Sequence, residues 1–503
     1  MAVSNLIKRL QNIMRNDAGI SGDAQRIEQM TWLFFLKVYD AQEDEWELKQ
    51  DDYKSIIPEE LRWRNWASGD KGTQLLTGDD LLTFVNNELF PRLKDLHIEQ
   101  SAPRSQWIVK EVFMDLNQYM KDGTMLRQVI NVIDEIDFSD AEDRHTFGDI
   151  YEGILKGLQS AGNAGEFYTP RALTDFIVQM LNPQLGEQMG DFSSGTGGFL
   201  TSTLAHLESQ CHTPQDKEQW QNSVRGQEWK PLPYLLSITN LLLHGVESPN
   251  IVHGDSLGRP ISSYKADEKV DVIAMNPPYG GSTTEAAKKN FPTDVRSSET
   301  ADLFMVLIMR RLKENGRAGV IIPDGFLFGT DGAKLAIKTA LLRDFNLHTI
   351  IRLPGSIFAP YTSIATNIVF FNNEVAEGAP EGFKTKEVWF YRLDMPEGYK
   401  HFNKTNPMKL AHCQPAAEWW NNRQPLQDAD GNDKARCFST EELVSLSCNF
   451  DQCKFPKSEE EILPPAELLK DYFAKRAELD REIDRTLAEI QKILGIDIQS
   501  IVK

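Results

Sequence analysis

The sequence predicts an α/β protein with a doubly wound, mostly parallel sheet, preceded by an all-helical domain and followed by a long helix. Short runs rich in β-branched residues alternate with helical runs from about residue 150 onward. Alternating strands and helices form βαβ units, which build a parallel sheet covered on both faces. No comparable strand signal precedes residue 150, and the C-terminal part shows apolar residues at helical spacing.

Residues 1–150 are predicted to form the helical N-terminal domain. The first sixteen residues have apolar side chains at helical spacing, interrupted by charged ones, which indicates an amphipathic helix rather than a signal peptide. A second helix is expected after the capping segment 21–23. Trp46, Trp63, Trp66 and Trp107 are among the tryptophans scattered through this region. We expect these rings to pack in a core or between domains rather than to bind a cofactor.

Residues 151–400 are predicted to contain the sheet. The β-rich runs are 223–227, 250–253, 270–275, 318–322, 348–353 and 366–371. Helical stretches at 232–243, 303–312 and 333–345 separate them. In a doubly wound sheet the ligand binds at the carboxyl ends of the strands, so the loops that follow the strands are expected to carry the chemistry.

Residues 401–465 are predicted to be an irregular connecting segment, and residues 466–503 a helix that docks on another subunit. In the Asp-rich stretch 427–433, counted from Asp428, the glycine falls at the fourth position and no glutamate stands at the twelfth, so we expect a solvated turn rather than a calcium loop. Apolar residues from Leu469 to Leu494 form a stripe between charged faces. Such a helix needs a partner along its length. We expect that partner to be another subunit, and the alternative is that the helix docks on its own chain.

The charge balance bears on any nucleic-acid substrate. The chain has 54 Lys and Arg against 74 Asp and Glu, a formal net charge of −20. Proteins that grip nucleic acid unaided usually carry a basic surplus, which displaces condensed counterions. If DNA is the substrate, local basic patches or a partner must therefore hold it.

Cysteine usage and hydropathy limit the class of protein further. Five cysteines without a CxxC pair, and no histidine cluster at ligand spacing, indicate free thiols in a reducing cytoplasm and no metal site. No apolar run reaches the ~18 residues that a membrane span needs.

The most specific motif is Asn276-Pro277-Pro278-Tyr279, directly after the apolar run 270–275. Two prolines end the strand in a rigid turn, which holds the Asn276 side chain and the Pro277 carbonyl in fixed directions. Two convergent acceptors suit an exocyclic amino group, because hydrogen bonds to both turn its lone pair toward an electrophile. Tyr279 offers a π face for a planar ring. The alternative is a rigid turn that merely ends a strand.

A glycine-rich turn runs from Asp191 through Gly195 and Gly197 into an apolar helix. The glycines allow close approach of a ligand, and the helix N-terminus presents backbone amides. The turn lacks the Lys-Ser/Thr of a P-loop and the third glycine of a nicotinamide-binding fingerprint. By itself it predicts a ligand loop without naming the ligand.

Two further acids follow strands of the same βαβ series: Glu228 and Asp255. A carboxylate at the end of the second strand can accept hydrogen bonds from both hydroxyls of a ribose. Each acid alone is typical of a solvated loop. In series with Asp191 and Asn276, at four strand ends of one sheet, they predict a nucleoside-cofactor site.

Together, the motif at 276–279 and the turn at 191–197 resemble the S-adenosylmethionine-dependent methyltransferases that act on N6 of adenine. The segment 165–171 and the helical N-terminal domain resemble a narrower family, the modification (methyltransferase) subunits of type I restriction-modification systems. The resemblance implies the S-adenosylmethionine-dependent methyltransferase fold, with Asn276, Pro277, Pro278 and Tyr279 handling the target base. The candidate cofactor-binding residues are Glu166, Phe167, Tyr168, Thr169, Pro170, Arg171, Asp191, Ser194, Gly195, Thr196, Gly197, Glu228 and Asp255.

The resemblance also implies a reaction and partners. A methyl group would pass from S-adenosylmethionine to N6 of an adenine flipped out of double-stranded DNA, because a paired, stacked base cannot present N6 to the cofactor. This modification protects host DNA from restriction. Members of the family read sequence through a specificity subunit, shared by two modification subunits, and cut DNA only with a restriction (motor-nuclease) subunit.

Three other functions are compatible with the same motifs. A stand-alone N6-adenine DNA methyltransferase would need residues 375–460 to contact DNA. A protein glutamine-amide methyltransferase can use the same Asn-Pro-Pro-Tyr turn, because a side-chain amide is also planar with an NH2 group, but that class rarely has a large helical N-terminal domain. A non-enzymatic scaffold is disfavoured by the intact motifs, and binding of S-adenosylmethionine would separate it from an enzyme.

Overall fold

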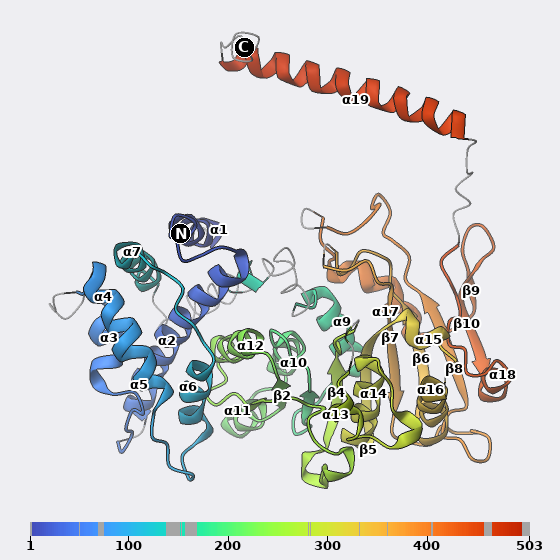
Figure 1. The fold of residues 1–503 in the computed structure, drawn as a ribbon. Coiled ribbons are helices and arrows are strands. Elements are labelled where there is room, and N and C mark those ends of the chain that lie inside the picture. Colours follow the sequence, from blue (N-terminus) through green and yellow to red (C-terminus); the bar gives the residue numbers. More distant parts are fainter. Residues whose placement is uncertain are drawn as a thin grey trace. The chain divides into compact units, whose positions relative to one another are not determined.

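The computed structural model describes residues 3–49, 51–68, 75–136, 151, 153–155, 168–279, 281, 283–330, 332–359, 361–403, 406–456 and 465–494. Two compact units divide the chain, residues 1–454 and residues 455–503. The first unit contains the helical region and the whole sheet (Figure 1).

The described part of residues 3–136 contains helices and no strand, as predicted. The α-helices are α1 (Val3–Arg15), α2 (Asp23–Lys49), α3 (Trp63–Trp66), α4 (Gly78–Phe84), α5 (Phe90–Lys94), α6 (Arg104–Met114) and α7 (Gly123–Asp134). Trp46, Trp63 and Trp66 are buried in the hydrophobic core, and Trp107 packs against it. The expectation that these rings pack in a core is confirmed.

One ten-stranded sheet forms the centre of the first unit, in the order β3-β2-β1-β4-β5-β7-β6-β8-β10-β9. Its strands are β1 (Met189–Asp191), β2 (Val224–Glu228), β3 (Ile251–His253), β4 (Val270–Met275), β5 (Leu312–Pro323), β6 (Asn346–Arg352), β7 (Thr366–Asn372), β8 (Glu387–Arg392), β9 (Leu426–Gln427) and β10 (Asp433–Ser439). The half from β3 to β5 is parallel throughout, whereas β7 runs antiparallel to both of its neighbours. The predicted α/β class is confirmed.

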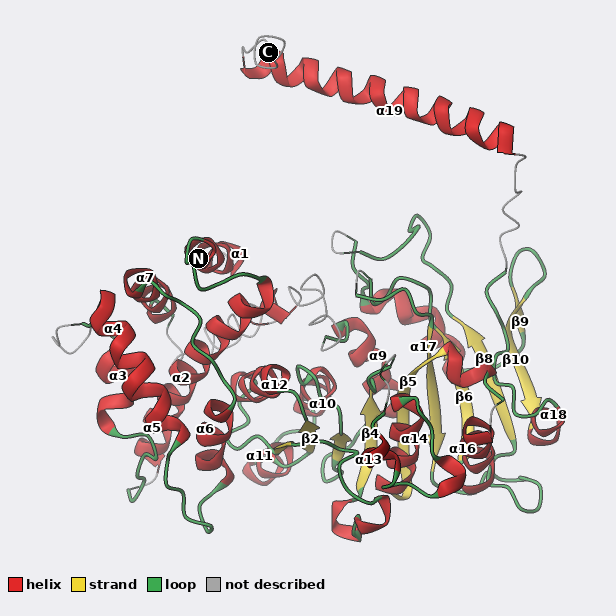
Figure 2. Cartoon of the chain, viewed as in Figure 1, coloured by secondary structure: helices red, strands yellow, loops and turns green. Residues whose placement is uncertain are grey.

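Helices cover both faces of the sheet (Figure 2). Along β4, Val272 and Ala274 belong to one hydrophobic cluster, whereas Ile273 and Met275 belong to the other. Successive side chains of a strand point to opposite faces, so this apolar run is continuous because both faces are buried. The first cluster includes α9 (Arg171–Leu181), α10 (Gly198–Glu208) and α12 (Pro231–Leu243). The second includes α14 (Thr300–Arg311) and α16 (Gly332–Asp344).

The helical region packs on the β3 side of the sheet. Helix α12 contacts both α2 and α6, and Arg104 donates a hydrogen bond to the Ile251 carbonyl at 2.6 Å. The Tyr234 hydroxyl donates to Glu111 at 2.6 Å, which ties α12 to α6. The helical region therefore braces β3 and α12, two elements next to the site described below.

Residues 401–465 differ from the irregular segment expected from the sequence. They contribute α17 (Gln414–Asn421), α18 (Thr440–Ser445), β9 and β10, and β10 pairs with β8 at the end of the sheet. The expected turn at 427–433 joins β9 and β10, with Asp428 accepting hydrogen bonds from the backbone amides of Asp430 and Asn432. The composition of this segment is rich in turn-forming residues and does not indicate the short strands β9 and β10. Strand β10 pairs with β8, which is distant in the sequence.

The second unit contains α19 (Pro465–Leu494), which matches the predicted C-terminal helix. Its apolar stripe is exposed along the helix; these side chains are Leu469, Tyr472, Leu479, Ile483 and Leu487. None of the helices in the described part of the chain has the length and apolar character of a membrane span.

Candidate functional site

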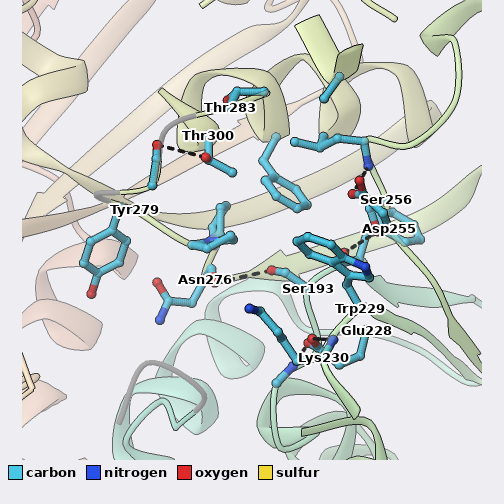
Figure 3. A pocket seen from close by; sticks show the side chains of 18 of the residues that line it. Ser193, Glu228, Trp229, Lys230, Asp255, Ser256, Asn276, Tyr279, Thr283 and Thr300 are labelled. Carbon is cyan, nitrogen blue, oxygen red and sulfur yellow. Dashed lines mark hydrogen bonds between the residues drawn. The ribbon is translucent and has the colours of Figure 1, made fainter. Parts of the chain in front are cut away.

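A cavity of about 360 Å³ opens at the carboxyl end of the parallel strands. Its lining includes residues that directly follow or end β1, β2, β3 and β4, so the strand-end residues singled out in the sequence come together in space. In the view of Figure 3, Asn276 lies between Tyr279 and the segment 228–230. A smaller cavity beside it shares Ser193, Gly195 and Asn276 with the main one.

Glu228 links the end of β2 to the glycine turn. Its carboxylate accepts one hydrogen bond from the backbone amide of Gly195 and another from that of Lys230, each at 2.8 Å. The side chain is buried, with 7% exposed, yet it lines the cavity. A carboxylate held in this way has a fixed direction and keeps lone pairs for a ligand's hydroxyl groups.

The glycine turn needs glycine where the backbone enters the left-handed region. Gly195 has φ 53° and Gly197 has φ 78°. A Cβ at Gly197 would also lie 2.7 Å from the Ser237 hydroxyl oxygen. The positive φ angles and the short distance to Ser237 both disfavour larger residues at these positions. Glycine therefore allows the backbone of the turn to lie close to α12 and to the cavity.

Asn276 is oriented by two contacts. Its side-chain Nδ2 donates to the Thr169 hydroxyl at 3.1 Å, and its backbone carbonyl accepts from the Ser193 hydroxyl at 3.3 Å. Its Oδ1 is buried and makes no hydrogen bond within the described part of the chain. A buried acceptor without a donor is costly, so a hydrogen-bond donor on a ligand would stabilise this oxygen.

Tyr279 and Phe358 form an aromatic wall next to Asn276. Their ring centroids lie 6.2 Å apart in an edge-to-face arrangement, and Tyr361 lines the same cavity. Burial raises the pKa of Tyr279 above its ordinary value, so the hydroxyl stays neutral near pH 7. The wall offers apolar faces on which a planar ring can stack.

Asp191, at the end of β1, is almost fully buried and lines the smaller cavity. Burial raises the pKa of its carboxyl to about 8, against the lowering effect of the Ser193 amide, which donates to it at 3.1 Å. The nearby Glu228 raises this pKa further. Such a carboxyl is largely protonated at pH 7, and a cation placed beside it would favour the carboxylate.

Some of the other predicted site residues line the two cavities, and others do not. Asp255 is exposed and lines the main cavity, whereas Thr169, Ser194 and Thr196 line the smaller one. Arg171 joins α9 to α10 instead, by donating to the Gly198 carbonyl at 2.7 Å. Tyr168, Pro170 and Gly197 lie next to these residues without lining either cavity. Glu166 and Phe167 lie outside the described residues.

Sequence reasoning missed several cavity residues, above all Trp229. This side chain follows Glu228 directly, lines the cavity and is 61% exposed, with the Lys230 ammonium 5.3 Å from its ring centroid. The position of Trp229 directly after the strand-end acid Glu228 could have identified it as a site residue from the sequence. Thr283, Phe304 and Phe358 also line the cavity, but nothing in their local sequence marks them.

The described residues contain no group of three or more His, Cys, Asp or Glu side chains that could hold a metal ion. All five cysteines lie in the described part and are free thiols. The cavity lining offers carboxylates, amides, hydroxyls, aromatic rings and the amino group of Lys230.

Two protein families match this chain. The N-6 DNA methylase family matches residues 142–461, and the HsdM N-terminal domain matches residues 3–133. The type I restriction enzyme EcoEI methylase subunit of Escherichia coli is 48% identical over 499 residues, covering 98% of each chain.

Solved structures give the same match. A modification subunit of a type I restriction enzyme from Vibrio vulnificus YJ016 is 39% identical, with a TM-score of 0.75 over 88% of this chain and 93% of that one. A chain from a study of assembly and conformational transition in the type I restriction-modification system is 33% identical. Its TM-score is 0.77 over 98% of both chains.

Proposed function

Because this chain belongs to the methylase subunits of type I restriction enzymes, within the N-6 DNA methylase family, we propose that the cavity described above is its methyl-transfer site. The observation that carries this proposal is the Asn276 Oδ1, which is buried, oriented and without a donor. In our proposal, the exocyclic amino group of adenine supplies that donor, and the Pro277 carbonyl accepts a hydrogen bond from its second N–H. Both bonds draw the nitrogen lone pair out of the ring and aim it into the cavity.

The residues present fit S-adenosylmethionine as the cofactor. Glu228 offers carboxylate oxygens for a ribose, and Trp229 offers a face for an adenine ring. The glycine turn and Asp191 line the adjoining smaller cavity, where a cationic amino acid moiety would be held. When bound, this cofactor supplies an electrophilic methyl group. The chain's part is positioning, and in our proposal the proton passes to solvent after transfer.

The target base must leave the duplex to reach this site. Asn276 lies in a cavity lined on one side by Tyr279 and Phe358, so a base inserted there would stack on the aromatic wall. We propose that DNA is held largely by partners, because the chain carries a net charge of −20. The partners are a specificity subunit, shared by two copies of this chain, and a restriction subunit.

The test of this function uses the purified full-length chain with and without its specificity subunit. We expect the chain alone to bind S-adenosylmethionine and to bind DNA weakly, and the complex to form N6-methyladenine in DNA. The measurement is transfer of a labelled methyl group, followed by nucleoside analysis. Methylation at another base position, or none in the complex, would reject the proposal.

The pKa of Asp191 makes cofactor binding depend on pH. In the free protein this pKa is about 8, so the carboxyl is mostly protonated at pH 7. A cationic ligand beside it favours the carboxylate and lowers the pKa, so affinity for S-adenosylmethionine should rise as the pH increases from about 6 toward 8. Binding at pH 7 should also release a proton, which titration calorimetry detects in buffers of different ionisation enthalpy. Asp191→Asn should abolish this release; proton-free binding by the unaltered chain would place the cation elsewhere.

We propose that α19 docks on the specificity subunit through its exposed apolar stripe. Deleting residues 466–503 should release that subunit while keeping cofactor binding, because residues 1–454 form a compact unit with their own core. Co-elution on size exclusion measures the first effect. A point variant tests the stripe without removing the helix. Leu479→Glu places a charge on the stripe and should weaken assembly, whereas Glu478→Gln should not. Assembly retained after the deletion would contradict this assignment.

A further inference from the structure

A second cavity, of about 350 Å³, lies on the sheet away from the methyl-transfer site. Its floor is a row of three side chains from adjacent strands, because Arg317 on β5 pairs with Asn372 on β7, which pairs with Asn346 on β6. Paired residues project to the same face of a sheet. Asn346 begins β6, so the row lies toward the amino-terminal end of that strand, whereas the methyl-transfer residues follow the carboxyl ends of β1 to β4.

A β-bulge aims His348 at this cavity. The register of β6 against β7 shifts between Leu347 and Thr349, which leaves His348 as the extra residue. Bulges redirect side chains and are enriched next to functional sites. The ring of His348 lies beside the rings of Phe370 and Trp420, at centroid distances of 6.5 and 5.5 Å. Burial lowers the pKa of His348 to about 3, so the imidazole is neutral.

The cavity's two arginines differ in how their charge is balanced. Arg317 forms a two-pronged pair with Glu187, both N–O distances being 2.7 Å. Arg423 forms no ion pair with any residue that the structure describes. Its guanidinium lies 4.4 Å from the Trp420 ring centroid and donates only long bonds, at 3.5 Å to the His348 carbonyl and 3.4 Å to the His348 Nδ1.

Arg423 therefore carries a charge that has no ion-pair partner among the described residues, in a partly desolvated place. Burial lowers the pKa of its guanidinium more than Cys437 and Glu387 raise it, and the neutral His348 supplies no counter-charge. Placing a charge away from water costs free energy unless an opposite charge or good hydrogen bonds offset it. An anion in the cavity would supply both, since guanidinium groups bind phosphate and carboxylate with paired hydrogen bonds.

Two more groups line the cavity with unused hydrogen-bonding capacity. Among the residues described, neither the Asn346 side-chain amide nor the Trp420 ring nitrogen makes a hydrogen bond to another residue. Phe370 and Trp420 add apolar ring surface, and their centroids lie 4.8 Å apart. An amide that both donates and accepts suits the edge of a planar heterocycle.

From these contacts we propose that the cavity binds a small anion bearing a planar ring, of the size of a nucleoside monophosphate. The anionic group lies at Arg423, the ring packs on the aromatic residues, and Asn346 reads the ring's edge. The volume of about 350 Å³ falls in the range of small-molecule sites, and a lone inorganic anion would leave most of it unfilled. This site is separate from the methyl-transfer cavity and does not depend on the function proposed for it.

Adenosine monophosphate, adenosine and inorganic phosphate are the probes, measured by equilibrium dialysis against the full-length chain. We expect the monophosphate to bind more tightly than either of the others. Arg423→Gln should lower its affinity about tenfold or more, as for loss of hydrogen bonds to a charged group. Asn346→Leu, which breaks no internal hydrogen bond, should lower it as well. Arg436→Gln removes an exposed arginine and should change nothing.

An adenine nucleotide could also bind at the methyl-transfer site. The variant Glu228→Gln distinguishes binding there from binding at this second cavity. Monophosphate binding that survives Glu228→Gln and falls in both Arg423→Gln and Asn346→Leu supports the proposal. Binding lost only in Glu228→Gln overturns it, as does the absence of binding. Phosphate or adenosine binding as tightly as the monophosphate also overturns it. Thermal melting of each variant shows whether it is folded.

Discussion

Replacing Asn276 by alanine is expected to reduce methyl transfer by about two to three orders of magnitude, the usual effect of removing one positioned polar group from a reacting centre. S-adenosylmethionine binding should change little, because Glu228 and the glycine turn do not depend on the Asn276 side chain. Single-turnover transfer of labelled methyl groups in the assembled complex measures the first effect. Calorimetric titration of the cofactor measures the second.

Two further variants make this result specific. Asn276→Asp keeps acceptor oxygens at the same place and should retain more transfer than Asn276→Ala, because the amine keeps an oriented partner. Asn222→Ala removes an exposed asparagine and should leave transfer unchanged. Unchanged methylation in Asn276→Ala would reject the role that we propose for this residue.

Replacing Glu228 by alanine is expected to weaken cofactor binding by about two orders of magnitude. The change removes the proposed ribose acceptor and both backbone hydrogen bonds that hold the loop ends, those from Gly195 and Lys230. Hydrogen bonds to a charged group contribute about 1.5–3 kcal/mol each, so losing one or two of them accounts for an effect of this size. Cofactor dissociation constants from calorimetry give the comparison.

The pattern of kinetic change distinguishes Glu228 from Asn276. With saturating S-adenosylmethionine, Glu228→Ala should recover much of its transfer rate, whereas Asn276→Ala should not. The reason is that, in our proposal, the Asn276 side chain orients the reacting amine and Glu228 does not. Glu441→Ala, at an exposed acid, serves as the matched control. An unaltered cofactor affinity in Glu228→Ala would place the ribose elsewhere.

Local sequence patterns were sufficient for most of the parallel half of the sheet, although β1 (Met189–Asp191) is not among the β-rich runs. The apolar run 270–275 and the Pro-Pro turn after it predict a buried strand that stops at residue 275, and β4 has these bounds. The helical run 232–243 likewise corresponds to α12. Both rest on short-range physics, namely the burial of apolar runs and the conformational limits of proline.

The far half of the sheet could not be predicted in the same way. Strand β10 has the partly polar sequence of residues 433–439, and its pairing with β8 joins segments about forty residues apart. Trp389 and Tyr391 lie in β8, and their pairing with β6 and β10 depends on which edges the rest of the fold leaves open. Edge pairing is a tertiary choice that composition does not encode.

The sequence by itself determined the fold class, the family resemblance and the identity of the strand-end residues Asp191, Glu228, Asp255 and Asn276. Tertiary structure alone decided how these residues meet: Glu228 holds the Gly195 amide, and Thr169 turns the Asn276 amide so that its oxygen is left without a donor. It also revealed Trp229 in the first cavity and, in the second, Arg423, which has no ion-pair partner among the described residues. Motifs arise from neighbours in the chain, whereas burial, unpaired acceptors and uncompensated charges arise from neighbours in space.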